Sequence, residues 1–347
     1  MTSITITEES LRALVRSLLT GHGADPSEAA VVADAMVWSD VMGRPNQGAW
    51  RLPTLIARLT QGHIKSPCRA RFQRIGAAAG IVDGGNGSGH FVGHRAMLEA
   101  IALAQECGVG LVGVRNSNLF GAGAYYVQLA AEVDMISFAL SNSPPHVAAF
   151  GGRKAVLGTN PFAFGAPRRN GRSVLVDMST AASAGSTILK MVEGDRSQLL
   201  PEGIAIDQEG QPTRDPRQIG SLLPLAGAKG FGLGLLVEIL CGVLTGAGIS
   251  HEVKKFAQET GHNGHFFLAI DVGKFMPLAT YYDRMETLVG YLMASSGAPG
   301  EEATVQLPGE HRWQARDKSL RDGITLDAPT VAALTQLAER AAVTVPW

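Results

Sequence analysis

The segment Gly227-Ala228-Lys229-Gly230 combines a lysine with small residues, and the apolar run over residues 231–243 behind it predicts a helix. A helix N-terminus presents backbone N–H donors. An ammonium group beside them adds a point charge, so the pair suits a phosphate or a carboxylate. A solvated surface lysine gives the same local pattern, so on sequence grounds Lys229 is a candidate anion-binding residue and no more.

A second glycine-rich segment, Gly84-Gly85-Asn86-Gly87-Ser88-Gly89-His90, has the composition of a dinucleotide-binding loop. That fingerprint requires the order G-x-G-x-x-G and an acidic residue about 20 positions further on. With the first two glycines at positions 85 and 87, His90 takes the third glycine position and Gln105 takes the acidic position. We therefore interpret the segment as a turn between a strand ending near Asp83 and a helix beginning near residue 94. A classical Rossmann domain is not predicted.

Two further histidines have the spacing of metal ligands. His262 and His265 form a His-x-x-His pair before an apolar run, but no Glu or Cys completes a ligand set, so no metal site is predicted. His90 fits a core or a rim position equally well.

The composition favours a small-molecule partner. Thirty Lys and Arg stand against 31 Asp and Glu, for a net charge of −1, and no run of like charges indicates a nucleic-acid or lipid surface. The three cysteines, Cys68, Cys107 and Cys241, are far apart and form no metal or disulfide pattern, which fits a reducing compartment. The N-terminus lacks the basic and apolar regions of a signal peptide. We expect a cytoplasmic protein with neither a nucleic-acid nor a membrane partner.

The chain of 347 residues predicts two or three compact units with helices at both ends. Thr7 and Asp25 are N-cap candidates before two amphipathic helices, and the alanine-rich residues 330–343 predict a C-terminal helix.

Between these ends, strands and helices alternate. The patterns predict a helix over 94–107 closed by Gly108, a strand over 109–114, a helix over 125–133 and a strand over 135–140. The apolar stretch 231–249 contains Glu238 and several glycines, so we interpret it as a buried core helix rather than a membrane span.

Several segments, in order over roughly residues 10–310, resemble the malate/L-lactate dehydrogenase type 2 family. That family also includes ureidoglycolate dehydrogenase, diketogulonate reductase, sulfolactate dehydrogenase and the piperideine/pyrroline-2-carboxylate reductases. The segments are Arg51-Leu-Pro53, Val114-Arg-Asn-Ser-Asn-Leu-Phe-Gly121, Phe150-Gly-Gly152, Leu157-Gly-Thr-Asn-Pro-Phe-Ala163, Val176-Asp-Met178, Pro201-Glu-Gly203, Pro212-Thr-Arg-Asp-Pro216 and Ala228-Lys-Gly-Phe-Gly232.

The resemblance implies an α/β, non-Rossmann nicotinamide-binding fold with a mixed, largely antiparallel sheet and helical N- and C-terminal segments. It implies NADPH or NADH as cofactor and a homodimer whose cofactor site lies between domains. We expect a helical domain from residues 1–70 with 312–347. Residues 71–311 would form the cofactor- and substrate-binding region, in two subdomains.

By position, the resemblance also assigns roles to individual residues. Arg51 falls on an arginine suited to clamping a substrate carboxylate through a bidentate pair. The cofactor-binding positions are Ser143, Asp177, Met178, Ser179, Lys229, Gly309, Glu310 and His311.

The chain departs from the family at the positions that transfer protons. Members generally read Ser-His-Gly shortly before the arginine, where this chain has Asn46-Gln47-Gly48, and they carry a histidine where this chain has Leu119. Family members often carry a lysine after the Asp-Met segment, and this chain has Ser186 near that place. A glutamine amide cannot exchange a proton at accessible pH, and the loss of a general acid typically lowers the rate by about 10² to 10⁴.

This loss leads to a hypothesis about the substrate. Reduction of a ketone needs a proton for the alkoxide, whereas hydride addition to a protonated imine gives a neutral amine directly. We therefore expect a small carboxylate-bearing imine, such as a cyclic 2-imino acid, held by Arg51 and oriented by Asn46 and Gln47, with Leu119 as an apolar wall.

Two alternatives stay open. His146, after Ser143 and two prolines, can supply a relocated acid for reduction of a 2-oxo acid. Alternatively, the scaffold keeps its pocket without redox chemistry and acts as a binding protein or in a non-redox step.

Overall fold

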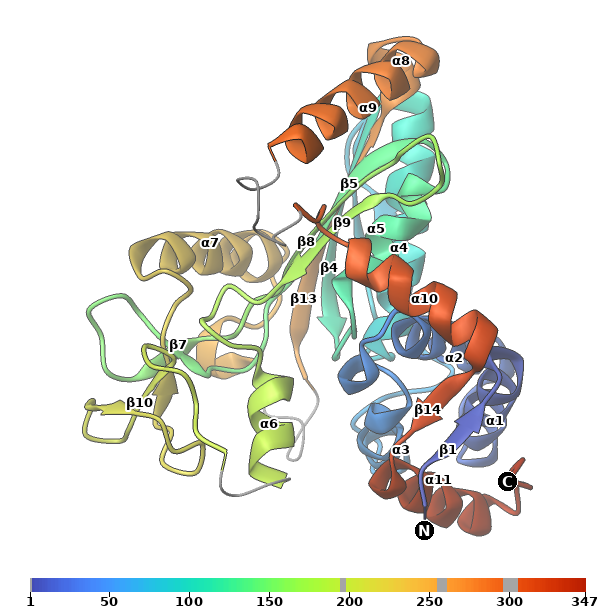
Figure 1. Cartoon of the computed structure of the whole chain (residues 1–347), viewed down its shortest axis with the longest axis vertical. Coiled ribbons are helices and arrows are strands. Elements are labelled where there is room, and N and C mark those ends of the chain that lie inside the picture. The colour runs from blue at the N-terminus through green and yellow to red at the C-terminus, as the bar shows by residue number, and fades with distance from the viewer. Residues whose placement is uncertain (1, 194–197, 255–260, 296–304) are drawn as a thin grey trace.

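A computed structural model describes residues 2–193, 198–254, 261–295 and 305–347 (Figure 1). Its centre is a seven-stranded sheet in which the β3–β4 pair is parallel and the other pairs are antiparallel. The strands, in spatial order, are β2 (Arg71–Arg74), β3 (Ala79–Asp83), β4 (Val109–Ser117), β13 (Asn263–Asp271), β5 (Met135–Ser141), β8 (Phe162–Ala166) and β9 (Val174–Met178). The predicted mixed, largely antiparallel sheet is confirmed.

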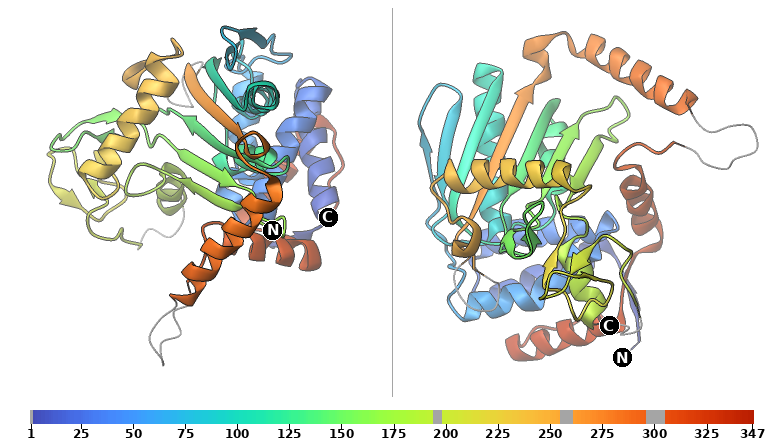
Figure 2. Two further views of the ribbon diagram at one scale, coloured as in Figure 1. Left: turned by 90° about the horizontal axis from the view of Figure 1, so that it is seen from above. Right: turned by 90° about the vertical axis from the view of Figure 1, so that its left-hand side faces the viewer.

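Helices lie on both faces of this sheet (Figure 2). One face is covered by α4 (Gly89–Cys107) and α5 (Gly123–Ala131), whose small and apolar residues pack on the strands in one continuous core. The other face carries α7 (Ala228–Glu238), which continues into the π-helical turn η3 (Ile239–Val243).

A second core joins the two ends of the chain. It is built by α1 (Glu8–Gly21), α2 (Pro26–Val41), α3 (Leu52–Thr60) and α11 (Ala328–Ala341), with β1 (Ile4–Ile6) paired to β14 (Ile324–Leu326). Helix α10 (Glu310–Asp322) connects the main sheet to this layer. The helical ends expected from the sequence are therefore present, and the domain boundaries at residues 70 and 312 stay a prediction.

A small five-stranded sheet packs with α6 (Gly185–Glu193) around a third core. Its strands, in spatial order, are β11 (Pro212–Thr213), β10 (Ala205–Ile206), β12 (Ser221–Leu222), β6 (Val147–Ala148) and β7 (Ala155–Leu157). The remaining elements are η4 (Ser250–Glu252), α8 (Val272–Phe275) and α9 (Leu278–Ala294), and α9 extends away from the body of the molecule in Figure 2.

Several boundaries differ from those predicted. Helix α4 begins at Gly89 rather than near residue 94, strand β4 continues to Ser117, and α5 begins at Gly123. Position 89 has no room for a side chain, because a Cβ there would collide with the backbone of Asn118 and Leu119. A glycine that the sequence pattern assigns to a turn thus lets the first helical turn approach a neighbouring loop.

The apolar stretch over residues 231–249 is not a buried helix. Helix α7 ends at Glu238, and the α7–η3 segment leaves a stripe of large apolar side chains exposed: Leu235, Leu236, Ile239, Val243 and Leu244. No helix among the described residues has the length and apolarity needed to cross a membrane.

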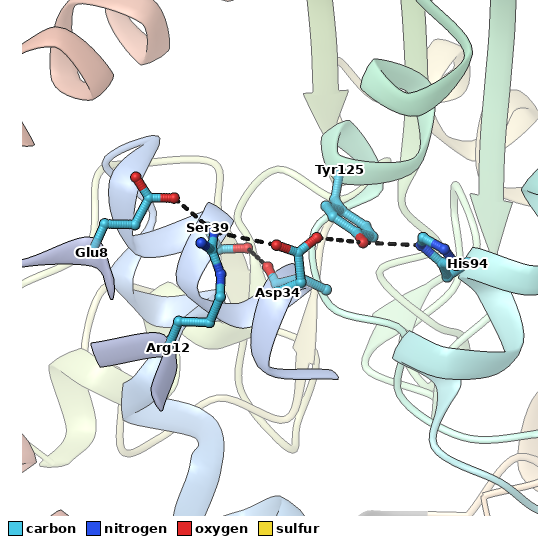
Figure 3. Close-up of polar contacts among 7 residues, drawn as sticks. Glu8, Arg12, Asp34, Ser39, His94 and Tyr125 are labelled. Atoms are coloured by element: carbon cyan, nitrogen blue, oxygen red, sulfur yellow. Dashed lines mark hydrogen bonds and ion pairs between the residues drawn. The ribbon is translucent and has the colours of Figure 1, made fainter. Parts of the chain in front are cut away.

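A polar chain fastens the helical layer to the main sheet (Figure 3). Arg12 of α1 lies 2.6 Å from Glu8 and 3.2 Å from Asp34 of α2. The Tyr125 hydroxyl of α5 donates to Asp34 at 3.0 Å and lies 2.9 Å from Nδ1 of His94 on α4. These contacts fix the relative position of the two layers that carry the candidate site.

Candidate active site

The helices of this chain begin in two ways. Helices α1, α2 and α11 have side-chain caps, since Thr7, Asp25 and Asp327 accept hydrogen bonds from backbone N–H groups. Helices α5, α7 and α10 start after Ala122, Gly227 and Gly309 with no side-chain cap. An uncapped helix start favours an anion, and in these three helices the Tyr125, Gly230 and Arg312 amides already donate to backbone carbonyls.

Two of these uncapped starts meet at Asp177, near the end of β9. One carboxylate oxygen of Asp177 lies 3.4 Å from Arg312 in the first turn of α10. The other would lie 3.4 Å from a Cβ at Gly123, the first residue of α5. The Leu175 amide donates to the Pro308 carbonyl at 3.0 Å, which holds the segment before α10 against β9.

The residues that follow β9 connect it to the region of the small sheet. The Ser179 hydroxyl donates to the Thr159 carbonyl at 3.1 Å, and the Thr159 and Ser143 hydroxyls are 3.4 Å apart. The Leu225 amide donates to the Thr180 carbonyl at 3.0 Å, so the start of α7 with the exposed Lys229 lies beside this strand end.

The structure thus brings the eight predicted cofactor residues into one continuous stretch. Gly309, Glu310 and His311 stand at its α10 end, Asp177 and Met178 in the middle, and Ser143, Ser179 and Lys229 toward α7. Uncapped helix starts at both ends and a half-buried carboxylate between them fit a ligand that carries phosphates and ribose hydroxyls.

The loop with the predicted substrate residues consists of two 3₁₀ turns, η1 (Pro45–Gln47) and η2 (Ala49–Arg51). Arg51 Nε donates to the Asn46 carbonyl at 3.3 Å, and its guanidinium lies 4.8 Å from the centre of the Trp50 ring. The Gln47 side-chain oxygen is buried and has no hydrogen-bond partner among the described residues. Helix α6 packs beside η1, but the Ser186 side chain lies outside the described part of the chain.

A buried carboxyl group, that of Asp40, packs against this loop and binds its backbone. Asp40, at the end of α2, accepts the Ala49 amide at 2.8 Å. It also leaves no room for a side chain at Gly48. Burial raises the pKa of Asp40 to about 7.

The polar residues of the segment 114–121 act as anchors. Asn116 donates to Asp83 at 3.0 Å, and Asn118 accepts from Arg58 at 2.7 Å. Ser117 bonds His265. Together these contacts anchor the segment around Leu119, which is half-buried.

His90 is a residue of this region that the sequence interpretation did not identify. It is buried, its Nδ1 lies 3.4 Å from the Ser88 hydroxyl, and its ring packs directly on Gly121, two residues after Leu119. Burial lowers the pKa of His90 to about 4, and the charge of Arg51 adds to this effect. His90 therefore touches the segment that carries Leu119 and lies near enough to Arg51 for its pKa to respond to that charge. No local pattern in the sequence reveals this, because the contacts join segments 30 or more residues apart.

Three further histidines, His265, His262 and His146, have different surroundings. His265 is fully buried between the Ser141 and Ser117 hydroxyls, each 2.8 Å away, and burial lowers its pKa to about 3. His262 is exposed. His146 is exposed at the start of the small sheet, with Nδ1 2.8 Å from the Pro144 carbonyl. No three His, Cys, Asp or Glu side chains within the described ranges are grouped to hold a metal ion.

Comparison with known proteins gives the family. The chain matches malate/L-lactate dehydrogenase over residues 6–335 and belongs to that family. It is 34% identical to malate dehydrogenase of Pyrococcus abyssi, over 98% of this chain and 96% of that one. It is 31% identical to the NAD(+) ureidoglycolate dehydrogenase of Escherichia coli, over 92% of each chain.

A third relative is named as a reductase of two cyclic imino acids. The chain is 31% identical to Δ1-pyrroline-2-carboxylate/Δ1-piperideine-2-carboxylate reductase of Pseudomonas syringae pv. tomato, over 96% of both chains. The solved structure of the piperideine-2-carboxylate reductase from this organism superposes with a TM-score of 0.87, covering 96% of this chain and all of that one. The fold and the sequence thus define an oxidoreductase of a family that works with a nicotinamide cofactor.

Proposed function

We propose that this chain reduces a small carboxylate-bearing imine, a 2-imino acid, with a hydride from a bound nicotinamide cofactor. The observation that carries the proposal is the buried, unpartnered oxygen of Gln47 beside Arg51. A buried acceptor without a donor is costly, and a ligand that supplies the donor recovers that energy. The N–H of a protonated imine is such a donor, whereas a ketone oxygen is not.

The residues around Gln47 fit the remaining parts of this substrate. Arg51 would bind the carboxylate, and its contact with the Asn46 carbonyl directs the guanidinium along the loop. Leu119 would exclude water from the reacting carbon. When bound, the cofactor supplies the hydride, and the imine nitrogen takes up the electron pair of the C=N bond. No protein acid is needed for this step.

A substrate panel tests the proposal. Oxidation of NADH and of NADPH is followed by absorbance with pyruvate, with pyruvate plus methylamine, and with cyclic 2-imino acids. We expect turnover of the imines and turnover of free pyruvate lower by at least about 10². Gln47→Leu, which removes the acceptor, should lower kcat/KM for the imines by about 10- to 100-fold. Equal turnover of pyruvate with and without amine contradicts the proposal.

A second candidate function, reduction of a 2-oxo acid, is favoured by the position of His90 on Gly121. Burial is the larger cause of the lowered pKa of His90, and the charge of Arg51 is the smaller one. Binding of a carboxylate to Arg51 would neutralise that smaller contribution and so raise the pKa of His90 in part. In the same panel, this function requires turnover of pyruvate alone that His90→Asn abolishes. If His146→Gln abolishes it instead, the acid is His146, as first expected from the sequence.

The exposed apolar stripe on α7–η3 supports the proposed homodimer. Val243 and Leu244 are 61% and 63% exposed in the single chain. A contiguous apolar surface of this kind marks an interaction site, and in this family the expected partner is a second copy. A cytoplasmic location stays part of the proposal.

A redox-inactive role predicts a flat panel. Binding of NADH or NADPH without any turnover would favour a scaffold that retains the pocket only.

A further inference from the structure

Arg312 occupies a position that is unfavourable for an unliganded cation. It is 2% exposed and lies in the first turn of α10, where the helix dipole already places positive charge. Among the described residues its ion-pair partner is Asp177, at 3.4 Å from Nη2, and its Nη1 atom is buried with no hydrogen-bond partner there. A buried guanidinium normally forms several hydrogen bonds, so this nitrogen indicates a missing anionic group.

Two more basic side chains gather at the same place. Helix α2 ends against α10, since a Cβ at Gly43 would lie 2.8 Å from the Cβ of Ala315, and this contact puts Arg44 beside the first turns of α10. Arg44 lowers the pKa values of both His311 and Arg312, and for each of them burial is the larger cause. We term Arg44, His311 and Arg312 the α10 basic cluster. Two carboxylates accompany it: Asp177, which pairs with Arg312, and Glu310 of the same helical turn, which accepts the Leu307 amide at 3.1 Å.

The two guanidinium groups of the cluster offer more hydrogen-bond donors than a ribose needs. Asp177 by itself suits ribose hydroxyls, which donate hydrogen bonds to a carboxylate. Two guanidinium groups and an imidazole suit a dianion with several acceptor oxygens, and an arginine fork matches phosphate geometry. The start of α10 adds the positive end of its helix dipole, while the Glu310 and Arg312 amides already donate to the Leu307 and Gly309 carbonyls.

We propose that the α10 basic cluster recognises the 2′-phosphate of NADPH, so that this chain selects NADPH over NADH. The inference rests on the proposed function, because it needs a nicotinamide dinucleotide in the stretch along β9. It adds a choice of cofactor and two residues, Arg44 and Arg312, to that function.

Equilibrium binding tests the inference without turnover. Titration followed by nicotinamide fluorescence should give a Kd for NADPH at least about tenfold lower than for NADH, as expected for charge-assisted hydrogen bonds. Arg44→Ala should raise the Kd for NADPH by about tenfold and change the Kd for NADH by no more than about twofold. Arg321→Ala is the control, because Arg321 lies on the same helix, is exposed and pairs with Asp322. It should change neither Kd.

Two further arms separate the sources of the phosphate and guard against misfolding. In a thermal-shift assay, 2′,5′-ADP should stabilise the protein, whereas 5′-AMP and inorganic phosphate should not at equal concentration. Arg312→Met tests the buried member directly. Since this variant can fail to fold, His311→Asn, at an exposed position, provides the second test and should weaken NADPH selectively.

The outcomes distinguish the two levels of inference. Equal affinity for NADPH and NADH, a preference for NADH, or an equal effect of Arg44→Ala on both overturns the phosphate subsite and leaves the proposed oxidoreductase intact. Stabilisation by inorganic phosphate as strong as by 2′,5′-ADP also overturns it, because the cluster would then bind a free anion. Failure of both dinucleotides to bind overturns the proposed function itself.

Discussion

At the scale of single residues, the chemistry of this site depends on which side chains can change charge. At the positions that we predict for proton transfer stand Gln47 and Leu119, whose side chains cannot change charge. Two buried groups of the same region, Asp40 and His90, can. Burial raises the pKa of Asp40 to about 7 and lowers that of His90 to about 4. Asp40 touches no ligand position directly. Through the Ala49 amide it positions the loop that carries Gln47 and Arg51.

Asp40 should make the stability of the protein depend on pH. Its unfolded-state pKa is about 3.9, so between about pH 4 and pH 7 the folded chain keeps a proton that the unfolded chain has lost. The free energy of unfolding therefore falls as pH rises through this window. Asp40→Asn should match the unaltered protein near pH 4 and exceed its stability by up to about 4 kcal/mol above pH 7.

Urea unfolding at about pH 5 and about pH 8.5 measures this difference. Asp283→Asn, at an exposed position on α9, is the control and should show no such trend. Parallel stability curves for Asp40→Asn and the unaltered chain would mean that the Asp40 carboxyl ionises in the folded state as it does in water.

At the scale of elements, three helices begin beside the candidate cofactor stretch, and none of them has a side-chain cap. Helices α1, α2 and α11 of the terminal core have such caps, whereas α5, α7 and α10 have none, as is also the case for α3, α4 and α9 elsewhere in the fold. The layers that carry these elements are joined by the polar chain of Figure 3, in which Tyr125 connects α5 to α2 and α4.

Tyr125→Phe should loosen this junction. The change removes the hydroxyl between Asp34 and His94 and leaves the ring contact with Trp38, so we expect a loss of about 1–3 kcal/mol in the free energy of unfolding. Denaturant unfolding measures it, with Tyr291→Phe on the exposed surface of α9 as the matched control. An unchanged midpoint for Tyr125→Phe would show that the polar chain adds no net stability.

At the scale of the whole molecule, the sheet and terminal cores place three segments close together: the loop of η1 and η2, the segment 114–121 and the start of α10. The outer surface carries the apolar stripe of α7–η3, which no element of the single chain covers among the described residues. A surface of this kind is consistent with a protein completed by a second subunit.

The double substitution Val243→Lys and Leu244→Lys should break the proposed dimer. Two charges in an apolar interface lose their hydration without partners, so we expect a monomer in sedimentation or light-scattering measurements. Ile75→Lys, an equally exposed apolar position on another surface, should leave the oligomeric state unchanged. A double variant that stays dimeric would place the interface elsewhere.

The sequence by itself determined the local features of this protein. Caps at Thr7 and Asp25, the stop at Gly108 and the alternating strands were predictable, because each depends on neighbours within a few residues. The family segments gave the fold and candidate site positions. The outward face of the 231–249 segment was not predictable, since an apolar run has the same pattern whether a core or a second molecule covers it.

Only the tertiary structure decided which distant residues meet. The local sequence pattern assigns Gly89 to a turn. In the structure Gly89 begins α4, and the backbone of Asn118 and Leu119 lies so close that only glycine fits there. His90 became a candidate for chemistry through its contact with Gly121, and Arg312 through its distance from Asp177 and its unpartnered nitrogen. Burial and electrostatic fields arise from packing between segments far apart in the chain, whereas periodicity and capping are written into adjacent residues.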